Sequence, residues 1–172
     1  MQFAKDSFYM ALCERLASVN PQRVVPVNGV DRTAVMVTEN EANSAAAMLP
    51  DVFYLEWRAS RIVEKQGGGG RPLIGIDCVI SYGSQGTSES GVDRGRTLAT
   101  LDGELLTICH PLHTRKRDFS QTPSVDLLAE VFWSAPEWGN SPRSMPSQSS
   151  ADPLLRHQAQ VTVFFFPEGD LA

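Results

Sequence analysis

Hydrophobic and polar or small residues alternate between positions 73 and 80, and this is the clearest pattern in the chain. The apolar residues on one side of the pattern are Ile74, Ile76, Cys78 and Ile80. Gly75 and Asp77 stand between them. Because successive side chains of a strand point to opposite faces, a period of two predicts a strand with one firmly buried face.

A helical spacing of apolar residues follows the polar stretch 81–91. Asp93 is placed to cap the helix start, and Pro111 lies just beyond its end. The apolar stripe consists of Leu98, Leu101, Leu105 and Ile108. Such a stripe must be buried against another element. We therefore expect this helix to pack on the preceding strand and to form the centre of the core.

The chain before this centre begins with another predicted helix, from Asp6 to Val19. Its cap is expected at Asp6, and Asn20-Pro21 ends it. The apolar positions with helical spacing are Phe8, Leu12, Leu16 and Val19. This is a first amphipathic helix.

Two β-prone segments, Val24–Val27 and Thr33–Thr38, flank the turn residues Asn28-Gly29. Asn-Gly is a strong hairpin signal, and Pro26 suits an edge position because proline donates no backbone hydrogen bond. The pattern therefore predicts a short hairpin. Residues 39–48 are polar and rich in alanine, and a loop and a short helix stay open as alternatives there.

Residues 51–65 alternate with Phe53, Leu55, Trp57 and Ala59 on one side, which predicts a long half-buried strand. The glycines that link it to the strand beginning at Leu73 are Gly67, Gly68, Gly69 and Gly70. Two alternating runs joined in this way predict an antiparallel hairpin whose flexible tip projects into solvent.

After the central helix, residues 110–125 are polar and contain two prolines, so we predict an exposed, mobile loop. Leu127–Ser134 has the composition of a strand, although a helical turn near 126–131 fits as well. Residues 136–153 form a second irregular insertion, and we expect Ser141–Ser150 within it to be mobile. Gln158–Phe166 alternates again and predicts the final strand.

The order helix, hairpin, long hairpin, helix, strand, strand predicts an α+β fold. We expect a mainly antiparallel sheet of about four to six strands, with two helices packed on one face. A chain of 172 residues with 42% hydrophobic residues suits a single domain over residues 1–172. The absence of a repeated βαβ pattern in the sequence argues against a doubly wound nucleotide-binding sheet.

Charge and cysteine content narrow the class of protein further. The net charge of −5 disfavours binding to nucleic acid over the whole surface, because such binding depends on lysine and arginine. Cys13, Cys78 and Cys109 are an odd number of cysteines inside predicted elements, so we expect reduced thiols. No apolar run approaches the ~20 residues of a membrane span, and the start lacks signal-peptide features, so a cytoplasmic location is expected.

Two glycine-containing stretches come close to known chemical motifs. The glycine run is followed by Arg71-Pro72 and a strand, whereas a phosphate-binding loop requires Gly-Lys-Ser/Thr opening a helix. In Gly86–Gly91, the Gly-x-Ser-x-Gly pattern of hydrolases is broken at Ser90. Neither motif is met. The sequence therefore predicts neither a phosphate loop nor a nucleophile elbow.

Two further groups carry potential ligands or acids. Cys109, His110 and His113 are close together, but a structural zinc site needs four ligands and His157 is distant. Asp77 is the one acid inside the central strand, and a solvent-facing or hydrogen-bonded role is favoured over a catalytic one. We therefore predict no catalytic residues, no metal site and no cofactor.

Arg115, Lys116 and Arg117 form a basic run within the predicted loop. A charge run in a loop is most often simply solvated, and no aromatic residues are interleaved as in a stacking platform for single strands. A local contact with DNA or with an acidic protein surface is the functional alternative.

The order of these parts resembles that of the tail terminator or tail completion proteins of tailed bacteriophages, also called minor tail proteins. The matching parts are Leu12–Ala17 in the first helix, the segment Pro50–Phe53, the long hairpin to Ile80, the helix Arg94–Cys109 with its centre Leu101–Leu106, and the final strand Arg156–Phe166. The resemblance spans most of the chain. The family has no invariant catalytic motif, and this chain departs from it in the insertions near 110–125 and 136–153.

The resemblance implies a non-enzymatic structural protein of a phage or prophage, acting in the host cytoplasm during assembly and in the virion or a tail-like particle. Such proteins form a ring, for which the family suggests six copies, that caps the tail tube, joins it to head-connector proteins and lets DNA pass. Ring closure requires head-to-tail contacts between copies. The candidate contact residues are Gly67, Gly68, Gly69, Gly70, Arg115, Lys116 and Arg117.

A different class of function also fits the predicted fold. A small α+β enzyme or ligand-binding domain would place its pocket between the sheet and the loops at 83–91 and 110–125.

Overall fold

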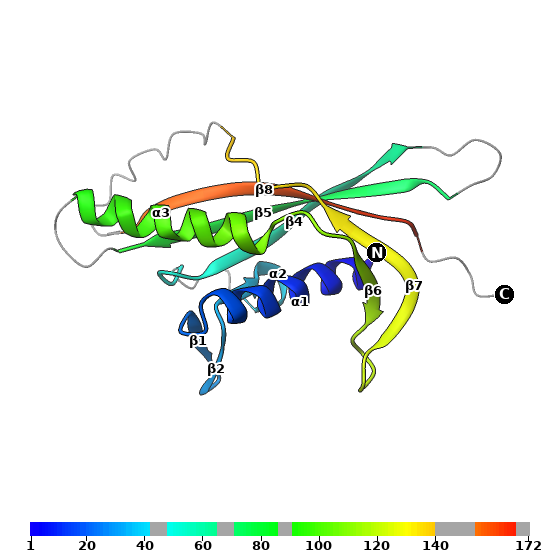
Figure 1. Ribbon diagram of the computed structural model, residues 1–172, viewed down its shortest axis with the longest axis horizontal. Helices are drawn as coiled ribbons and strands as arrows, with labels where there is room; N and C mark the ends of the chain where they lie inside the picture. The colour runs from blue at the N-terminus through cyan, green and yellow to red at the C-terminus, as the bar shows by residue number, and fades with distance from the viewer. Residues whose placement is uncertain (42–47, 65–70, 86–90, 140–153, 168–172) are drawn as a thin grey trace.

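The computed structural model describes residues 1–41, 48–64, 71–85, 91–139 and 154–167 (Figure 1). In chain order its elements are α1 (Gln2–Val19), β1 (Val24–Val27), β2 (Val30–Thr33), β3 (Val35–Val37), α2 (Thr38–Glu41), β4 (Phe53–Glu64), β5 (Leu73–Ser84), α3 (Gly91–Ile108), β6 (Thr114–Asp118), β7 (Val125–Trp133) and β8 (Leu155–Phe165).

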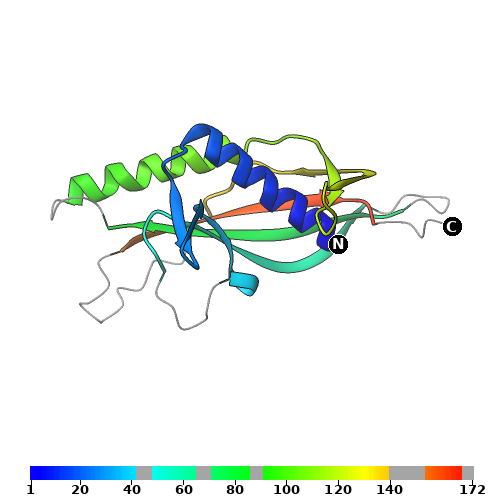
Figure 2. The same cartoon turned by 90° about the horizontal axis from the view of Figure 1, so that it is seen from below.

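Six strands form one sheet in the order β3-β4-β5-β8-β7-β6, and β1 and β2 form a separate hairpin. Neighbouring strands of the sheet are antiparallel except β3 and β4, which are parallel. Figure 2 shows α1 and α3 on the same face of the curled sheet. The predicted α+β class, the mainly antiparallel sheet and the two helices on one face are therefore confirmed.

The main core lies between this face of the sheet and the two helices. Its fully buried side chains include Phe8, Leu12 and Leu16 of α1, Ile76, Cys78 and Ile80 of β5, and Leu101, Leu105 and Ile108 of α3. Phe8 also meets the rings of Trp57 and Trp133 edge-on, with centroids 5.8 and 5.1 Å away. The predicted contact between the alternating strand and the striped helix is confirmed as the centre of the core.

Polar contacts join the two helices at their ends. Arg15 Nη1 of α1 donates to the carbonyl oxygens of Ile108 and His110, at 2.7 and 2.8 Å. These carbonyls lie at the C-terminal end of α3, where a cation is favourable and backbone acceptors lack helical partners. The guanidinium also lies 5.1 Å from the Trp133 ring. One side chain of α1 therefore caps α3.

The turn after α1 is held to α3 by a nearly buried ion pair. Arg23 Nη2 donates to Glu104 Oε1 at 3.0 Å, and Asn20 Nδ2 donates to the same oxygen at 2.8 Å. Arg23 Nε lies 2.5 Å from Glu104 Oε2, which is an ion-pair contact without hydrogen-bond alignment. The two charged side chains are 14% and 9% exposed. Asp51 lies 3.8 Å from Arg23 Nη1 but is 44% exposed, so Glu104 is the nearest and most buried opposite charge of Arg23.

The predicted helix starts at Asp6 and Asp93 are wrong. α1 begins at Gln2, and Asp6 lies in its second turn, where its carboxylate accepts from Gln2 Nε2 at 2.7 Å. α3 begins at Gly91, which places Asp93 in the first turn. An acid there is still favourable to the helix dipole, so the residue type was informative but the boundary was not.

The predicted hairpin forms, but its second strand is Val30–Thr33 rather than Thr33–Thr38. Asn28 and Gly29 have φ of 52° and 79°, as a two-residue hairpin turn requires. The chain leaves the hairpin at Ala34, whose N–H donates to the Arg23 carbonyl while its own carbonyl accepts from Phe53. β3 then joins the main sheet beside β4. The continuous β-prone pattern concealed this change of sheet.

Residues 39–48 begin as the end of α2, which favours the short-helix alternative for 39–41, while 42–47 lie outside the described residues. The glycines at 67–70 and the segment 141–150 also lie outside them, so their predicted mobility stays a prediction. Cys13, Cys78 and Cys109 are free thiols, the last two buried. In the described part of the chain, no helix is both long and apolar enough to cross a membrane.

Candidate functional site

The basic run at 115–117 lies on β6, and the predicted exposed loop at 110–125 is therefore wrong in its centre. β6 is the last strand of the sheet and pairs with β7. Alternation along a strand leaves Arg115 and Arg117 exposed but buries Lys116 completely. The proposed three-charge surface is thus reduced to two arginines.

Lys116 is held inside by two contacts of its ammonium group. Its Nζ donates to the Phe166 carbonyl oxygen at 2.7 Å and lies 5.1 Å from the centroid of the Phe165 ring. A lysine stem is apolar, so it suits the buried side of a strand when its ammonium group finds an acceptor. The burial of Lys116 between two exposed arginines explains why this run of three basic residues forms a strand.

The two exposed arginines differ in their partners. Arg115 Nη1 binds Asp126 Oδ2 at 3.0 Å, whereas Arg117 Nη2 donates to the backbone carbonyl of Ser124 at 3.4 Å. The N–H of Leu128, together with Arg115, holds the pKa of Asp126 below its ordinary value. Arg115 is therefore neutralised locally, while the charge of Arg117 is presented outward.

Leu128 departs from the regular pairing of β7. Residues 127–129 of β7 lie opposite residue 116 alone of β6, because Arg115 pairs with Glu130 and Arg117 with Asp126. Within this bulge Leu128 has φ of 55° and is 86% exposed, and its N–H donates to Asp126 Oδ1 at 2.8 Å.

The conformation of Leu128 is costly. A left-handed backbone costs an L-residue other than glycine roughly 1–2 kcal/mol. Exposing the side chain also forgoes the roughly 1.5–3 kcal/mol that burying a leucine contributes. Strained, exposed residues of this kind cluster at functional contacts. Leu128 is therefore the strongest single candidate for a contact residue in the described part of the chain.

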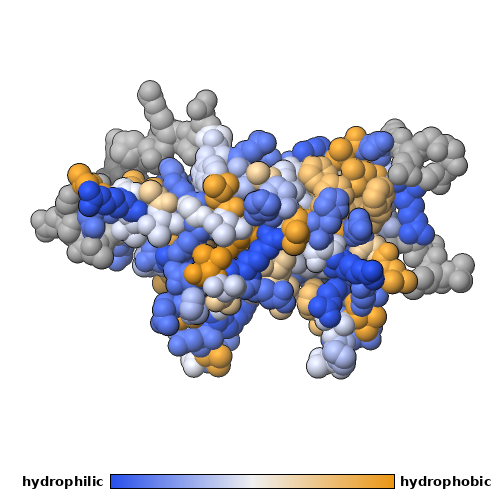
Figure 3. All heavy atoms as spheres, in the orientation of Figure 1, coloured by the Kyte–Doolittle hydropathy of each residue, from blue (hydrophilic) through white to orange (hydrophobic). Residues whose placement is uncertain are grey.

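Apolar and aromatic side chains lie around Leu128. A groove of about 430 Å³ is lined by Leu128, Ala129, Glu130, Arg71 and Phe166. On the sheet face turned away from the helices, the Phe132 ring stacks between His113 and Phe164, with centroids 4.9 and 5.2 Å away. The face that carries the helices also shows hydrophobic surface among hydrophilic residues, the larger area being on the side of β6 and β7 (Figure 3).

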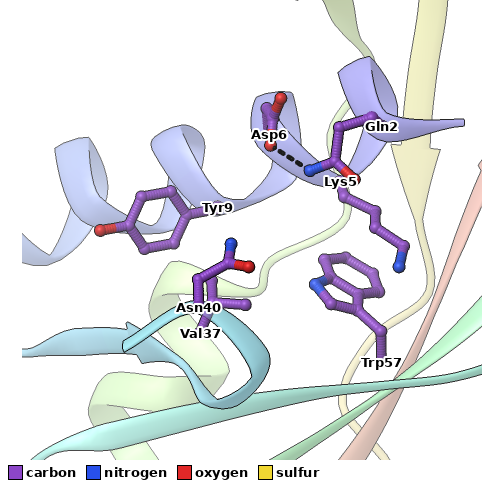
Figure 4. A pocket seen from close by; sticks show the side chains of 7 residues that line it. All are labelled: Gln2, Lys5, Asp6, Tyr9, Val37, Asn40 and Trp57. Carbon is purple, nitrogen blue, oxygen red and sulfur yellow. Dashed lines mark hydrogen bonds between the residues drawn. The ribbon is translucent and has the colours of Figure 1, made fainter. Parts of the chain in front are cut away.

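A second surface feature lies at the opposite edge of the sheet. A hollow of about 120 Å³ lies between α1, β3, α2 and β4 (Figure 4). Trp57 and Val37 supply apolar surface, and Lys5 Nζ lies 5.2 Å from the Trp57 ring centroid. Asp6 and Asn40 add polar groups around the opening. A hollow with an aromatic wall and a polar rim suits an inserted apolar side chain.

The strand beside this hollow has an open edge. β3 pairs with β4 only opposite Phe53–Leu55, so the rest of β4 has no neighbour on that side among the described residues. The Trp57 N–H donates instead to Glu39 Oε1 at 3.0 Å. Ile62 and Val63, near the end of the long hairpin, are 54% and 47% exposed. This edge therefore offers both backbone and apolar groups to a partner.

In the region of the alternative pocket, the described residues form a polar network. Tyr82 donates to Asp102 Oδ1, and Trp138 Nε1 donates to the Tyr82 hydroxyl at 2.7 Å. His157 Nδ1 lies 3.0 Å from the same Asp102 oxygen. Residues 86–90 lie outside the described residues. No sequence pattern indicated this network, because its members come from four distant segments.

Burial raises the pKa of Tyr82, and its hydrogen bond to Asp102 raises it further. The phenol therefore stays protonated and acts as a donor that joins β5 to α3. His157 is the exposed member, with 41% of its side chain accessible. The arrangement fastens the middle of α3 to the sheet.

The remaining chemical candidates are separated or engaged. Cys109 is buried, and burial raises its pKa to about 12, while His113 stacks on Phe132. No group of three potential metal-ligating side chains occurs within the described ranges. Thr162 Oγ1 donates to Asp77 at 2.7 Å and Arg61 also binds it, so Asp77 has the hydrogen-bonded role expected of it.

No protein-family model matches this chain, and no curated protein matches its sequence. The function is therefore inferred from the contacts described above and from the resemblance in the order of parts.

Proposed function

We propose that this chain is a structural assembly protein, similar to phage tail terminators, that forms a ring and caps a tail tube. In this role it contacts a neighbouring copy, the tube and the head-connector proteins, and it carries out no catalysis. Six copies and a central passage for DNA belong to the same proposal through the family resemblance.

The observation that carries the proposal is Leu128. Its side chain is 86% exposed and its backbone has φ of 55°. A leucine with a regular strand backbone and a buried side chain would cost less free energy. A partner that buries this side chain would recover the apolar free energy that the isolated chain forgoes. The feature therefore favours a protein whose working state is an assembly.

The surroundings of Leu128 support the same role. The groove beside it and the stacked rings of Phe132 and Phe164 provide further apolar surface. A stable protein interface buries about 1,200–2,000 Å² in total, which is more than one leucine side chain supplies. The groove and the stacked rings would therefore have to take part in the contact. Interfaces of modest size favour rings that form only at high concentration or on a tube end.

The charged groups divide between two possible partners. Arg117 faces outward and would meet an acidic surface of a neighbour or DNA inside the ring. Lys116 is excluded from this contact by its burial. Reversing Arg117 would then weaken assembly in a salt-dependent manner, whereas Lys116 would affect folding.

The proposal is tested with purified protein and purified tail tubes. Sedimentation and electron microscopy across a broad concentration range should show rings or caps at tube ends. The proposal fails if neither appears while a substrate screen finds turnover.

A ligand-binding or enzymatic function is the second candidate, and the exposed His157 beside Asp102 is the observation that favours it. His157→Gln keeps a hydrogen-bonding group but removes the titratable imidazole. Loss of turnover in this variant without loss of assembly would establish the second candidate instead.

A further inference from the structure

We propose that the head-to-tail contact between copies is made by Leu128 of one copy entering the Trp57 hollow of the next copy. The choice of a second copy as the occupant rests on the proposed ring-forming function. The two surfaces are different, so the contact is heterologous. Each copy can insert its own Leu128 into one neighbour and accept the Leu128 of another neighbour in its hollow.

The position of the two features within the fold supports this pairing. Leu128 lies on β7, near the β6 edge of the sheet, while the hollow lies at the β3–β4 edge. α1 stands between them: Ser7 accepts from the N–H of Arg117 on β6, while Lys5 lies over Trp57. A leucine at one edge and a hollow at the other give each copy two different contact surfaces, as head-to-tail contacts in a closed ring require.

The sizes of the two features match. The hollow has a volume of about 120 Å³. A truncated leucine leaves a cavity of about 150 Å³ in a protein core, so one leucine side chain is close to the volume available. The indole of Trp57 and the side chain of Val37 would contact the inserted methyl groups, and Asn40 would lie at the rim. This is the arrangement of an apolar centre within a polar ring.

The charges beside the two features are complementary. Arg117, next to Leu128, donates to a backbone carbonyl and not to a carboxylate. Asp6 and Glu39, next to the hollow, accept from an amide and from a backbone N–H and not from a cation. Asp126 lies opposite Arg117, and Lys5 lines the hollow beside Asp6, so each edge also carries a charge of the other sign. In the proposed contact Arg117 would meet Asp6 and Glu39 across the interface.

Crosslinking tests the geometry directly. One preparation carries Leu128→Cys and a second carries Asn40→Cys, and the two are mixed under mild oxidation at concentrations that favour association. We expect a disulfide-linked pair containing one chain of each kind. The control replaces Leu128→Cys with Leu106→Cys, an exposed leucine of α3, which measures background that includes the half-buried Cys13. Equal yields of the disulfide-linked pair for Leu128→Cys and for Leu106→Cys, each mixed with Asn40→Cys, would overturn the proposal.

Substitutions test the energetics. Leu128→Asp should weaken self-association by about 10–100-fold, as expected for a central contact residue, while Leu106→Asp should leave it unchanged. Arg117→Glu and Glu39→Arg should each weaken association, and the double variant should recover part of it. Unchanged association in Leu128→Asp, or no self-association of the wild-type chain at any concentration, would also overturn the contact.

The same variants separate this proposal from the proposed function. Tube capping that survives in Leu128→Asp, with no crosslink to Asn40→Cys, would keep the function and reject the contact. A specific crosslink in a protein that never caps a tube would keep the contact and reject the function.

Discussion

On the face of the sheet covered by α1 and α3, large apolar side chains such as Leu101 are completely buried, whereas on the β6–β7 hairpin Leu128 is 86% exposed. The same residue type thus occurs in two opposite environments. In the first, regular alternation and helical spacing agree with the packing. In the second, a bulge and a left-handed backbone turn a leucine outward at a cost.

The comparison indicates that stability and contact formation belong to different parts of this molecule. The buried face would tolerate little change, because tightly packed cores respond to the loss of single methylene groups. The hairpin would tolerate change well in the isolated chain and poorly in an assembly. Substitutions in the buried core should therefore change stability, and substitutions in the hairpin should change association.

The largest effect is expected for Leu101→Ala on α3. Removing this fully buried side chain should lower the free energy of unfolding by about 2–5 kcal/mol, measured by denaturant titration. The matched control is Leu106→Ala on the same helix, where the side chain is 52% exposed and the change should stay within about 0.5 kcal/mol. Similar values for the two variants would show that α3 does not face the sheet as described.

A smaller loss is expected for Glu104→Gln. The substitution keeps the size of the side chain but leaves the Arg23 guanidinium, 14% exposed, with only the Asp51 carboxylate, 3.8 Å away and 44% exposed, as an opposite charge. Because removing one partner of a buried ion pair strands the other, we expect a loss of about 2–3 kcal/mol in the free energy of unfolding.

The control for this ion pair is Glu56→Gln, which breaks the exposed pair with Arg58. Those side chains are 41% and 53% exposed, so the change should be below about 1 kcal/mol. A Glu104→Gln effect no larger than that of Glu56→Gln would contradict a structural role for the buried pair.

Acid should reveal a further contribution from Asp77. Burial works to raise the pKa of this group, but hydrogen bonds from Thr162 and Arg61 outweigh it and lower the pKa. A lowered folded-state pKa contributes stability above the unfolded value of about 3.9 and loses it as pH falls through the folded value. Asp77→Asn should therefore flatten the decline of stability below about pH 4, as measured by denaturant titration at several pH values. An unchanged slope would contradict this.

The sequence predicted the covered face well because local pattern and tertiary packing agree there. The alternation from Ile74 to Ile80 and the stripe from Leu98 to Ile108 each define one buried side, and these sides face each other. A single residue cannot reverse such patterns. The boundary at Asp6 failed because α1 begins at Gln2, and Met1 before it makes no side-chain cap that a sequence pattern could show. α3 likewise begins at Gly91, ahead of the acid in its first turn.

The candidate contact surface could not be predicted in the same way. Lys116 looks like a surface charge, and its burial depends on Phe165 and Phe166, which are far away in sequence. Leu128 looks like one more apolar residue of a strand. A local signal did exist: an aspartate two residues before a backbone N–H favours a turn, as Asp126 does for Leu128. The hollow at Trp57 depends on four separate elements and has no signature in the sequence.

The smallest expected effect on stability, and the sharpest test of the comparison, comes from Leu128→Gly. Glycine adopts the left-handed conformation freely, which relieves roughly 1–2 kcal/mol, but it adds entropy to the unfolded chain that costs roughly 0.5–1 kcal/mol. The isolated protein should therefore become more stable by up to about 1.5 kcal/mol in denaturant titration. The matched control is Leu112→Gly, since Leu112 is 52% exposed without a positive φ and should lose stability.

Association should move in the opposite direction to stability in Leu128→Gly. If the leucine is kept outward for a partner, its removal weakens self-association in sedimentation even as the single chain becomes more stable. If the leucine serves only the fold of the hairpin, stability and association should fall together or association should not change. A structural residue has no reason to improve one property at the expense of the other, whereas a contact residue held in a strained conformation does.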